Sequence, residues 1–163
     1  MSFIRLKKIN GKQYAYLVEN KWYKRGFKGK GKGSRQKVSK YLGRVYHLEK
    51  AIDKDFLGFK EINNLEEYLI NNAQDEIIKD LVRWEMFRHN IDSNEFLIDL
   101  NSKKIVKNKK AVSLKLNEGI LNSYTLRRLF NLRKEDSYYL ANCFVEAGIE
   151  VPKEVFVGLF VEE

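Results

Sequence analysis

Two stretches of this chain alternate apolar and polar residues with the period of a β-strand, and a stretch with helical periodicity follows each of them. The strand-like stretches cover residues 3–42 and 94–122, and the helical ones cover residues 47–89 and 123–163. This order predicts an α+β fold with a small basic N-terminal antiparallel β-sheet, a long central helix, a second β-hairpin and a C-terminal helical pair.

Short turn signals divide the first strand-like stretch. Asn10-Gly11 is the pair that a tight hairpin turn favours. Gly26–Ser34 is rich in Gly and Lys, which is typical of a flexible loop. The sequence therefore predicts an antiparallel meander of four strands, over residues 3–8, 12–18, 22–25 and 36–42.

Helical spacing of apolar residues predicts two helices in the second segment. One covers residues 47–57 and carries Leu48, Ile52, Phe56 and Leu57. The other begins after Asn64, which can cap it while Glu67 reaches back to form a capping box. It is long, because the helical spacing of apolar residues continues to about His89. Its apolar face is expected to pack in the core, although such a face would also support a homodimer.

Local signals also mark the helices of the last segment. Ser123 is predicted to cap a helix that carries Leu126, Leu129 and Phe130. The next helix is expected to end at Gly148, a residue type that commonly stops helices. Pro152 suits the first turn of a last short helix.

Charge is distributed unevenly along the chain. Residues 1–46 contain fourteen Lys or Arg and one acid, Glu19, for a net charge of +13, whereas residues 47–163 have a net charge of −4. We treat residues 1–46 as a basic, β-rich segment and residues 47–163 as a mixed helical and hairpin domain that would form one compact unit with it. A basic block of this kind is suited to a polyanion, and nucleic acid is the usual one. A solvated basic arm is the alternative.

The predicted strand pattern assigns a binding surface. If Ile4, Leu6, Ala15 and Leu17 face the core, the opposite face presents cations interleaved with tyrosines, whose rings can stack on bases while the cations bind phosphates. The alternative is that the tyrosines are core residues. With the cations of the Gly/Lys loop, the predicted nucleic-acid-binding residues are Arg5, Lys7, Tyr14, Tyr16, Lys28, Lys30, Lys32, Arg35, Lys37 and Tyr41.

Two motif-like segments need separate consideration. Gly26, Gly31 and Lys32 match the spacing of a nucleotide-binding P-loop, but Gly33 stands where Ser or Thr is needed and a strand, not a helix, is expected to follow. We therefore expect the loop to contact phosphates of nucleic acid.

Residues 125–149 have the rough length of a helix-turn-helix, with Arg127 and Arg128 near its turn. Glu135, Asp136 and Glu146 on the would-be reading helix favour a plain helical hairpin instead. The second β-hairpin carries Lys107, Lys109 and Lys110, which are expected to matter for binding only if this hairpin lies beside the first.

The sequence gives little support for catalysis, so we expect a protein that is not an enzyme and has no catalytic residues, cofactor or metal. His47 and His89 lack metal-ligand spacing, and Asp92, Glu95 and Asp99 are expected in a solvated loop and strand start. Cys143 is the only cysteine, which excludes an intrachain disulfide and fits a packed thiol.

No apolar stretch approaches the length of a membrane span. We expect a soluble, intracellular, cytoplasmic protein, with a Lys-, Ile- and Asn-rich composition of an archaeal kind.

Part of the chain resembles known families. The order that carries the resemblance is Phe3-Ile4-Arg5, Lys8-Ile9-Asn10-Gly11-Lys12, Tyr14-Ala15-Tyr16-Leu17-Val18 and Lys37-Val38-Ser39-Lys40-Tyr41-Leu42-Gly43-Arg44-Val45. It is similar to the N-terminal segment of certain insertion-sequence transposases and to the segment before the catalytic domain of archaeal Fic-type AMP-transferases. The resemblance implies an accessory domain that contacts nucleic acid. It implies no activity, because neither histidine is followed by Pro as in a Fic loop and a transposase needs a much larger ribonuclease-H-like core.

These observations favour a non-enzymatic nucleic-acid-binding protein, with DNA preferred over RNA and an association with a mobile element. An RNA- or ribosome-associated factor is the alternative within the same class. A regulatory or scaffold protein whose basic segment docks an acidic protein partner is the alternative from another class.

Overall fold

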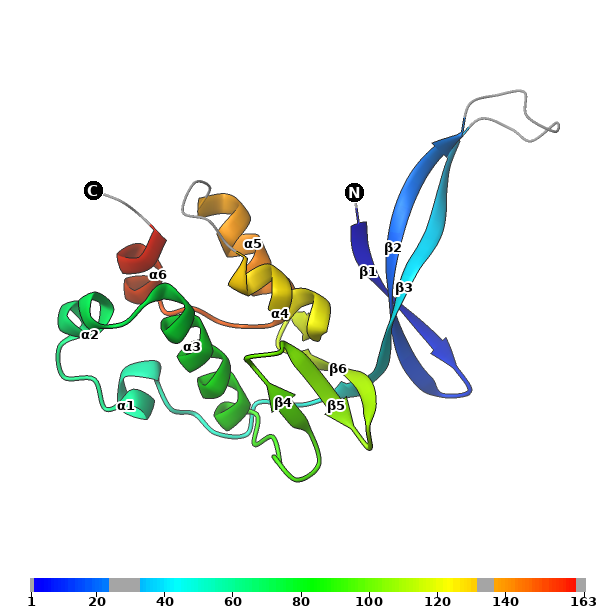
Figure 1. Cartoon of the computed structure of the whole chain (residues 1–163). Coiled ribbons are helices and arrows are strands. Elements are labelled where there is room, and N and C mark those ends of the chain that lie inside the picture. Colours follow the sequence, from blue (N-terminus) through cyan, green and yellow to red (C-terminus); the bar gives the residue numbers. More distant parts are fainter. Residues whose placement is uncertain (1, 24–32, 132–136, 161–163) are drawn as a thin grey trace.

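The computed structural model describes residues 2–23, 33–131 and 137–160 and confirms the predicted α+β class (Figure 1). Its strands are β1 (Ser2–Ile9), β2 (Lys12–Tyr23), β3 (Gly33–His47), β4 (Leu97–Asp99), β5 (Lys104–Lys107), β6 (Lys110–Leu116) and β7 (Gly119–Leu121). Its helices are α1 (Phe56–Lys60), α2 (Leu65–Asn71), α3 (Gln74–Arg88), α4 (Ser123–Phe130), α5 (Ser137–Ala147) and α6 (Lys153–Phe160).

All seven strands belong to one sheet, whose order is β1-β2-β3-β6-β5-β4, with β7 also paired to β6. The neighbours pair antiparallel except β3 and β6, which run parallel from Arg44 opposite Val112 to His47 opposite Lys115. The second hairpin therefore lies in the same sheet as the N-terminal strands. The division that the sequence suggests at residue 46 falls inside β3, next to this parallel pairing.

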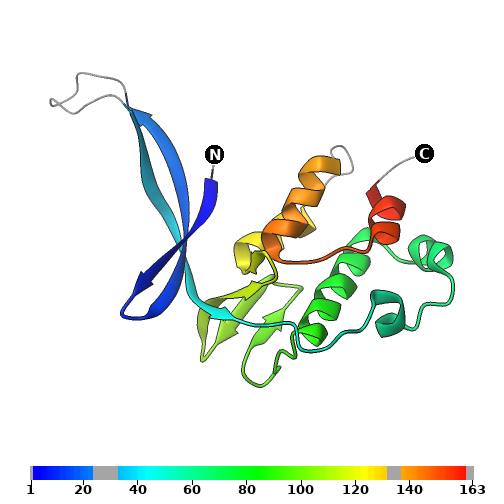
Figure 2. The same cartoon turned by 180° about the vertical axis from the view of Figure 1, so that it is seen from behind.

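The N-terminal strands form a long twisted ribbon that projects from the rest of the molecule (Figures 1 and 2). We define the ribbon as β1, β2 and residues 33–43 of β3, and the body as the remaining described residues. The predicted turn is present, with Asn10 and Gly11 at φ 52° and 78°. The separate strand predicted over residues 22–25 is wrong, because β2 continues without a break to Tyr23. The ribbon thus has three strands, and β3 extends beyond the predicted residue 42 to His47.

Strand β1 pairs with β2 only as far as Glu19, so the ends of β2 and β3 continue as a two-stranded arm. The arm comprises residues 20–23 and 33–36. Nearer the body, the β2–β3 register shifts twice, between Ala15 and Tyr16 and between Leu17 and Val18. Each shift leaves an extra residue on β3, first Leu42 and then Ser39. Bulges of this kind bend a strand and increase its twist.

The helix predicted over residues 47–57 is wrong for most of its length, since residues 48–55 have no regular structure and α1 begins at Phe56. Backbone hydrogen bonds to distant elements explain this difference. The amides of Ala51 and Ile52 both donate to the carbonyl of Arg88, at 2.8 and 2.9 Å. These bonds satisfy the backbone groups that a helix would have used.

The long central helix is interrupted. Asn64 caps it as predicted, its side chain accepting from the Glu67 amide at 3.2 Å, but α2 ends at Asn71 and α3 begins at Gln74. Asn72 and Ala73 are extended between them. The Tyr68 hydroxyl donates to Asp80 at 2.6 Å across the break, so the two helices are held at an angle that one straight helix would not allow.

The C-terminal helical pair is present, with one correction at its start. Asn122, not Ser123, caps α4: its side chain accepts from the amides of Tyr124 and Thr125 at 3.0 and 3.1 Å, and the Asn122 amide donates to the Thr125 hydroxyl. Helix α5 stops at Gly148, which has φ 75°, and Pro152 directly precedes α6.

The helices pack on the body part of the sheet and enclose the main core, which includes Ile78, Leu81, Leu114, Leu121, Leu126, Leu140 and Phe144. A smaller core of Ala15, Leu42 and Val45 joins the ribbon to the body, with Ile4, Leu6, Leu17 and Tyr124 packed against it. Among the described residues, no helix is long and apolar enough to cross a membrane.

Candidate nucleic-acid interface

Strand register places five of the residues predicted for binding on one face of the ribbon. Arg5 lies opposite Tyr16, Lys7 opposite Tyr14, and Tyr16 opposite Tyr41. Directly paired residues of antiparallel strands point to the same face. We call this surface, formed by Arg5, Lys7, Tyr14, Tyr16 and Tyr41, the tyrosine face. The other face carries Ile4, Leu6, Ala15 and Leu17, which contact the smaller core as the sequence predicted.

Lys37 does not share the face of Tyr41, contrary to the prediction. The two residues have the same parity in sequence, but Ser39 is an extra residue in the register between them, so Lys37 pairs with Glu19 rather than with a residue of the tyrosine face. One inserted residue moves every following side chain to the other face of a strand. Arg35, opposite Lys21, lies on the same side of the ribbon as Lys37, and all three side chains are exposed.

The three tyrosines form a contact cluster rather than a row of separate rings. The Tyr41 ring centroid lies 5.3 Å from that of Tyr16 and 6.4 Å from that of Tyr14, with tilted planes. Tyr14 and Tyr16 are half-buried, whereas Tyr41 is 53% exposed. Partial burial and the neighbouring tyrosines raise the pKa of Tyr41 above its usual range, so its hydroxyl stays protonated at neutral pH. Tyr41 is therefore the ring of this cluster most accessible to a ligand.

The second hairpin adds cations beside the tyrosine face. A hollow of about 570 Å³ lies between the ribbon and the β5–β6 turn, and Tyr14, Tyr41 and Arg44 line it together with Lys107 and Lys110. This adjacency follows from the parallel pairing of β3 with β6. Sequence reasoning missed Arg44 as a site residue. It stands three positions after Tyr41, which in a regular strand is the opposite face, and the bulge at Leu42 brings both residues to the same face.

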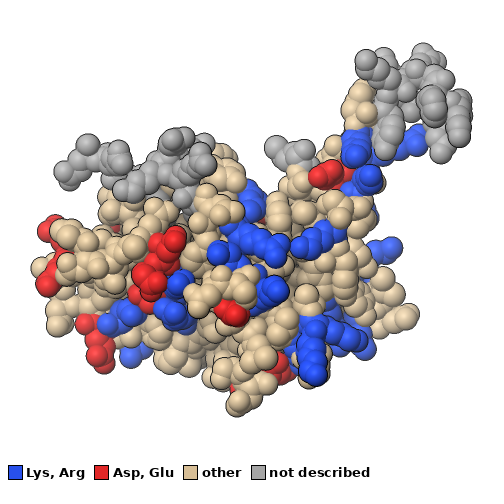
Figure 3. All heavy atoms as spheres, in the orientation of Figure 1, with Lys and Arg blue, Asp and Glu red and all other residues tan. Residues whose placement is uncertain are grey.

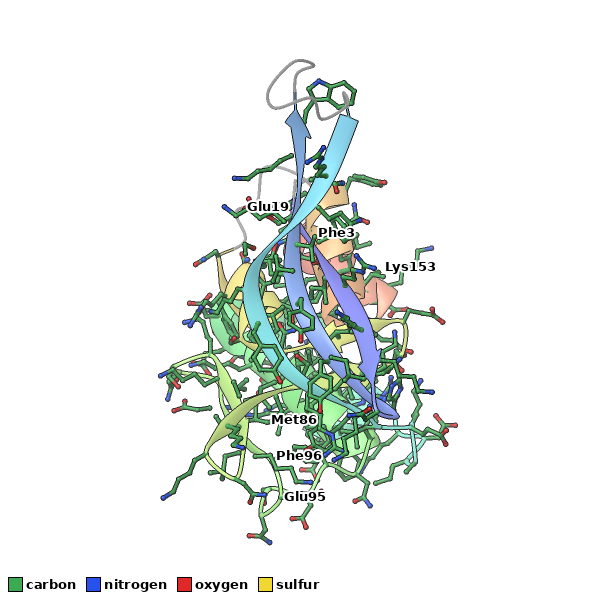
Figure 4. All side chains as sticks on the ribbon, turned by 90° about the vertical axis from the view of Figure 1, so that its right-hand side faces the viewer. Phe3, Glu19, Met86, Glu95, Phe96 and Lys153 are labelled. Carbon is green, nitrogen blue, oxygen red and sulfur yellow. The ribbon has the colours of Figure 1, made fainter. Side chains whose placement is uncertain are left out.

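These cations differ in their partners. The Lys107 ammonium donates to Glu95 at 2.6 Å and lies 4.6 Å from the Tyr46 ring centroid, so its charge is largely compensated. Figure 4 shows Glu95 and Phe96 below the lower end of the ribbon. The Arg44 guanidinium lies 4.9 Å from the same Tyr46 centroid. Among the described side chains, no carboxylate lies within ion-pair distance of Arg44 or Lys110.

Charge is separated in space as well as in sequence. In Figure 3 the basic side chains gather along the ribbon and at the hairpin side, and the acidic ones concentrate over the helices. Glu19, labelled in Figure 4, is the one acid of residues 1–46, and it accepts a hydrogen bond from the Ser2 hydroxyl at 3.4 Å. The predicted loop cations Lys28, Lys30 and Lys32 lie outside the described residues.

Of the two cations noted beside the turn of the possible helix-turn-helix, the side chain of Arg128 is engaged with other described residues and that of Arg127 is not. Arg128 forms an ion pair with Glu146 and packs over the rings of Tyr124 and Tyr139, with its Cζ 5.7 and 5.4 Å from their centroids. Arg127 is exposed. The turn between the helices, residues 132–136, lies outside the described part of the chain. Arg128 thus contributes to holding the two helices together.

A buried polar cluster at the end of α3 was not predicted. The fully buried carboxylate of Glu85 accepts from Arg88 at 3.0 Å, from the Glu150 amide at 3.0 Å and from Asn117 at 3.3 Å. The Glu-x-x-Arg spacing on a predicted helix is the one sequence signal that could have found it. Partial burial by itself raises the pKa of Glu150, but hydrogen bonds from Arg88 and Lys50 outweigh it and lower the pKa.

The remaining residues considered for chemistry have structural partners. Asp99 accepts from the amides of Ser102 and Asn101, and the hydrogen bonds from Ser102 and then Asn101 lower its pKa. Asp92 accepts from the Asn94 amide. Cys143 is buried, which raises the pKa of its thiol. Within the ranges that the structure describes, no three His, Cys, Asp or Glu residues are grouped so that they could hold a metal ion.

Comparisons with protein-family models, with curated proteins and with solved structures find no match to this chain.

Proposed function

We propose that this chain is a nucleic-acid-binding protein that holds the phosphate backbone with its N-terminal ribbon. The observation that carries the proposal is the concentration of positive charge on one projecting element: residues 1–46 have a net charge of +13, and three antiparallel strands carry most of the charged side chains into solvent. A polyanion rewards such clustering because each neutralised phosphate releases a counterion.

The shape of the ribbon supports DNA as the ligand. Its outer part is a two-stranded arm with exposed cations on one side, and the major groove of DNA, about 12 Å wide, admits a two-stranded β-ribbon. Trp22 on the arm is 67% exposed, which offers an aromatic contact beside the cations. The resemblance of residues 3–45 to transposase N-terminal segments also favours DNA over RNA as the ligand. It further favours an association with a mobile element. In this proposal the protein binds without catalysing a reaction.

Salt dependence of binding to a fluorescently labelled DNA duplex tests the proposal. The variant Lys21→Gln/Lys37→Gln removes two exposed charges from one side of the ribbon. We expect weaker binding and a log–log salt slope lower by about 2, because each phosphate contact contributes about 0.9 to the slope. The matched control, Lys54→Gln/Lys153→Gln, makes the same change in net charge on exposed residues of the body and should keep the wild-type slope.

Two results would contradict the proposal. Equal losses in the ribbon and body variants would mean that net charge alone matters and that the ribbon is not the binding element. Failure of the wild-type protein to bind any nucleic acid at low salt, together with binding to an acidic peptide such as polyglutamate, would favour the scaffold alternative.

A further inference from the structure

The tyrosine face ends at the hollow where the ribbon meets the β5–β6 hairpin. Its volume of about 570 Å³ lies within the range of about 300–1,000 Å³ that is usual for small-molecule sites. Tyr14 of β2 and Tyr41 and Arg44 of β3 line one side, and Asn108 and Lys110 of the β5–β6 hairpin line the other. The hollow is therefore large enough for a single nucleotide and combines rings with cations.

Tyr41 is the ring on which a ligand can lie. It is 53% exposed, and its contacts with the rings of Tyr16 and Tyr14, at 5.3 and 6.4 Å between centroids, restrict its orientation. A ring that is already held in place loses little entropy when a ligand stacks on it. Its neutral hydroxyl adds a hydrogen-bond donor at the edge of the hollow.

The charge of the hollow comes from Arg44 and Lys110. Lys110 is exposed at the start of β6, and Arg44, on the neighbouring strand β3, lies over Tyr46 of the same strand. Unlike Lys107, which is paired with Glu95, these two have no carboxylate partner among the described residues. Two uncompensated cations beside an accessible ring match the two parts of a nucleotide, its phosphate and its base.

We propose that this hollow binds one unpaired nucleotide, with its base stacked on Tyr41 and its phosphate held by Arg44 and Lys110. The inference rests on the proposed function and narrows it to nucleic acid with a single-stranded part. A base in a duplex is stacked on both faces and cannot lie on Tyr41, whereas an unpaired base can. Arg5 and Lys7, on the same face of the ribbon, supply cations for the adjoining phosphates.

Binding of two labelled twelve-residue oligonucleotides tests this inference: oligothymidylate, and an analogue of the same charge in which every base is missing. We expect the wild-type protein to bind oligothymidylate about tenfold more tightly than the abasic analogue, since stacking on an aromatic ring contributes about that factor or more per base. Tyr41→Ala should bring the ratio close to one, and Tyr41→Phe, which keeps the ring, should preserve it. Tyr138→Ala removes a tyrosine that is 78% exposed on α5 and should leave the ratio unchanged.

Removing the two cations of the hollow should affect binding differently from removing the Tyr41 ring. Arg44→Gln/Lys110→Gln should weaken binding of both oligonucleotides equally and lower the salt slope by about 0.7, because the two cations hold one phosphate and each neutralised phosphate of a single strand contributes about that much. A wild-type ratio near one, or a tenfold ratio that persists in Tyr41→Ala, would overturn the inference. If the protein still binds duplex DNA with its full salt slope, only this inference is lost; if it binds neither duplex nor oligonucleotide, the proposed function is lost with it.

Discussion

At the scale of single residues, Glu85 links three separate parts of the body. Its carboxylate receives hydrogen bonds from Arg88 on the same helix, from Asn117 in the β6–β7 turn and from the backbone of Glu150 after α5. A buried charge is tolerated only when its partners satisfy it, and removing one member leaves the others uncompensated. The cluster therefore makes the stability of the body depend strongly on one carboxylate.

We predict that Glu85→Gln, which keeps the shape but removes the charge, lowers the free energy of unfolding by about 3 kcal/mol, because Arg88 then loses the fully buried one of its two carboxylate partners and keeps only the partly exposed Glu150. Urea denaturation followed by tryptophan fluorescence measures the change. Glu76→Gln on the same helix is the control, since its exposed pair with Lys79 should contribute less than about 1 kcal/mol. Similar losses in the two variants would show that the buried cluster has no special role.

At the scale of secondary-structure elements, the cap of α4 also ties the helix to the sheet. The Asn122 side chain caps the helix with its oxygen and donates from its nitrogen to the Ser113 hydroxyl at 3.1 Å. Ser113, on β6, in turn donates to the carbonyl of Leu42 on β3 at 2.8 Å. A buried chain of hydrogen bonds thus connects α4, β6 and the strand that continues into the ribbon.

We predict that Asn122→Ala lowers the free energy of unfolding by about 2 kcal/mol, because it removes a helix cap and leaves the buried Ser113 hydroxyl oxygen without the donor from which it now accepts. Ser123→Ala, at the position that sequence alone would choose as the cap, should cost less than about 0.5 kcal/mol. Thermal or urea unfolding of the two variants gives the comparison. A larger effect of Ser123→Ala would contradict the assigned cap.

Elements with local signals were predictable from sequence, and elements shaped by distant contacts were not. The Asn10-Gly11 turn, the Asn64 cap and the stop at Gly148 each depend on a few neighbouring residues, and the structure confirms them. The break at Asn72–Ala73 and the irregular segment over 48–55 depend on contacts with Asp80 and Arg88, which sequence spacing does not reveal.

Some residues of the candidate site were also predictable from local pattern, and others depend on distant contacts. Simple alternation places Arg5, Lys7, Tyr14 and Tyr16 on one face, as the register of β1 and β2 does. Lys37 was assigned to the wrong face because a bulge has no reliable sequence signal. Gly43 shows what the bulged strand requires: its φ is 98°, and a Cβ there would lie 2.2 Å from the carbonyl oxygen of Ala111. Sequence could not indicate that this close approach brings Arg44 next to Lys110.

At the scale of the whole molecule, like charges concentrated on the ribbon repel one another in the absence of a polyanion. We predict that thermal stability rises by a few degrees as salt increases from about 0.05 to about 0.5 M, because screening shortens the range of this repulsion. Binding to nucleic acid should fall over the same range. Differential scanning fluorimetry at several salt concentrations measures the first trend, and a stability that falls steadily with salt would contradict it.

The pairing of β3 with β6 also sets the order in which the chain can be assembled. Leu42 and Ser113, joined by a hydrogen bond, stand 71 positions apart in the sequence. A ribosome that adds residues at about 5–20 per second needs roughly 4 to 14 seconds to make that intervening length. The N-terminal hairpin can form early because its contacts are local, yet it has nowhere to attach until β6 has been synthesised. The basic strands are thus expected to fold before β6 has been made and to dock only after it.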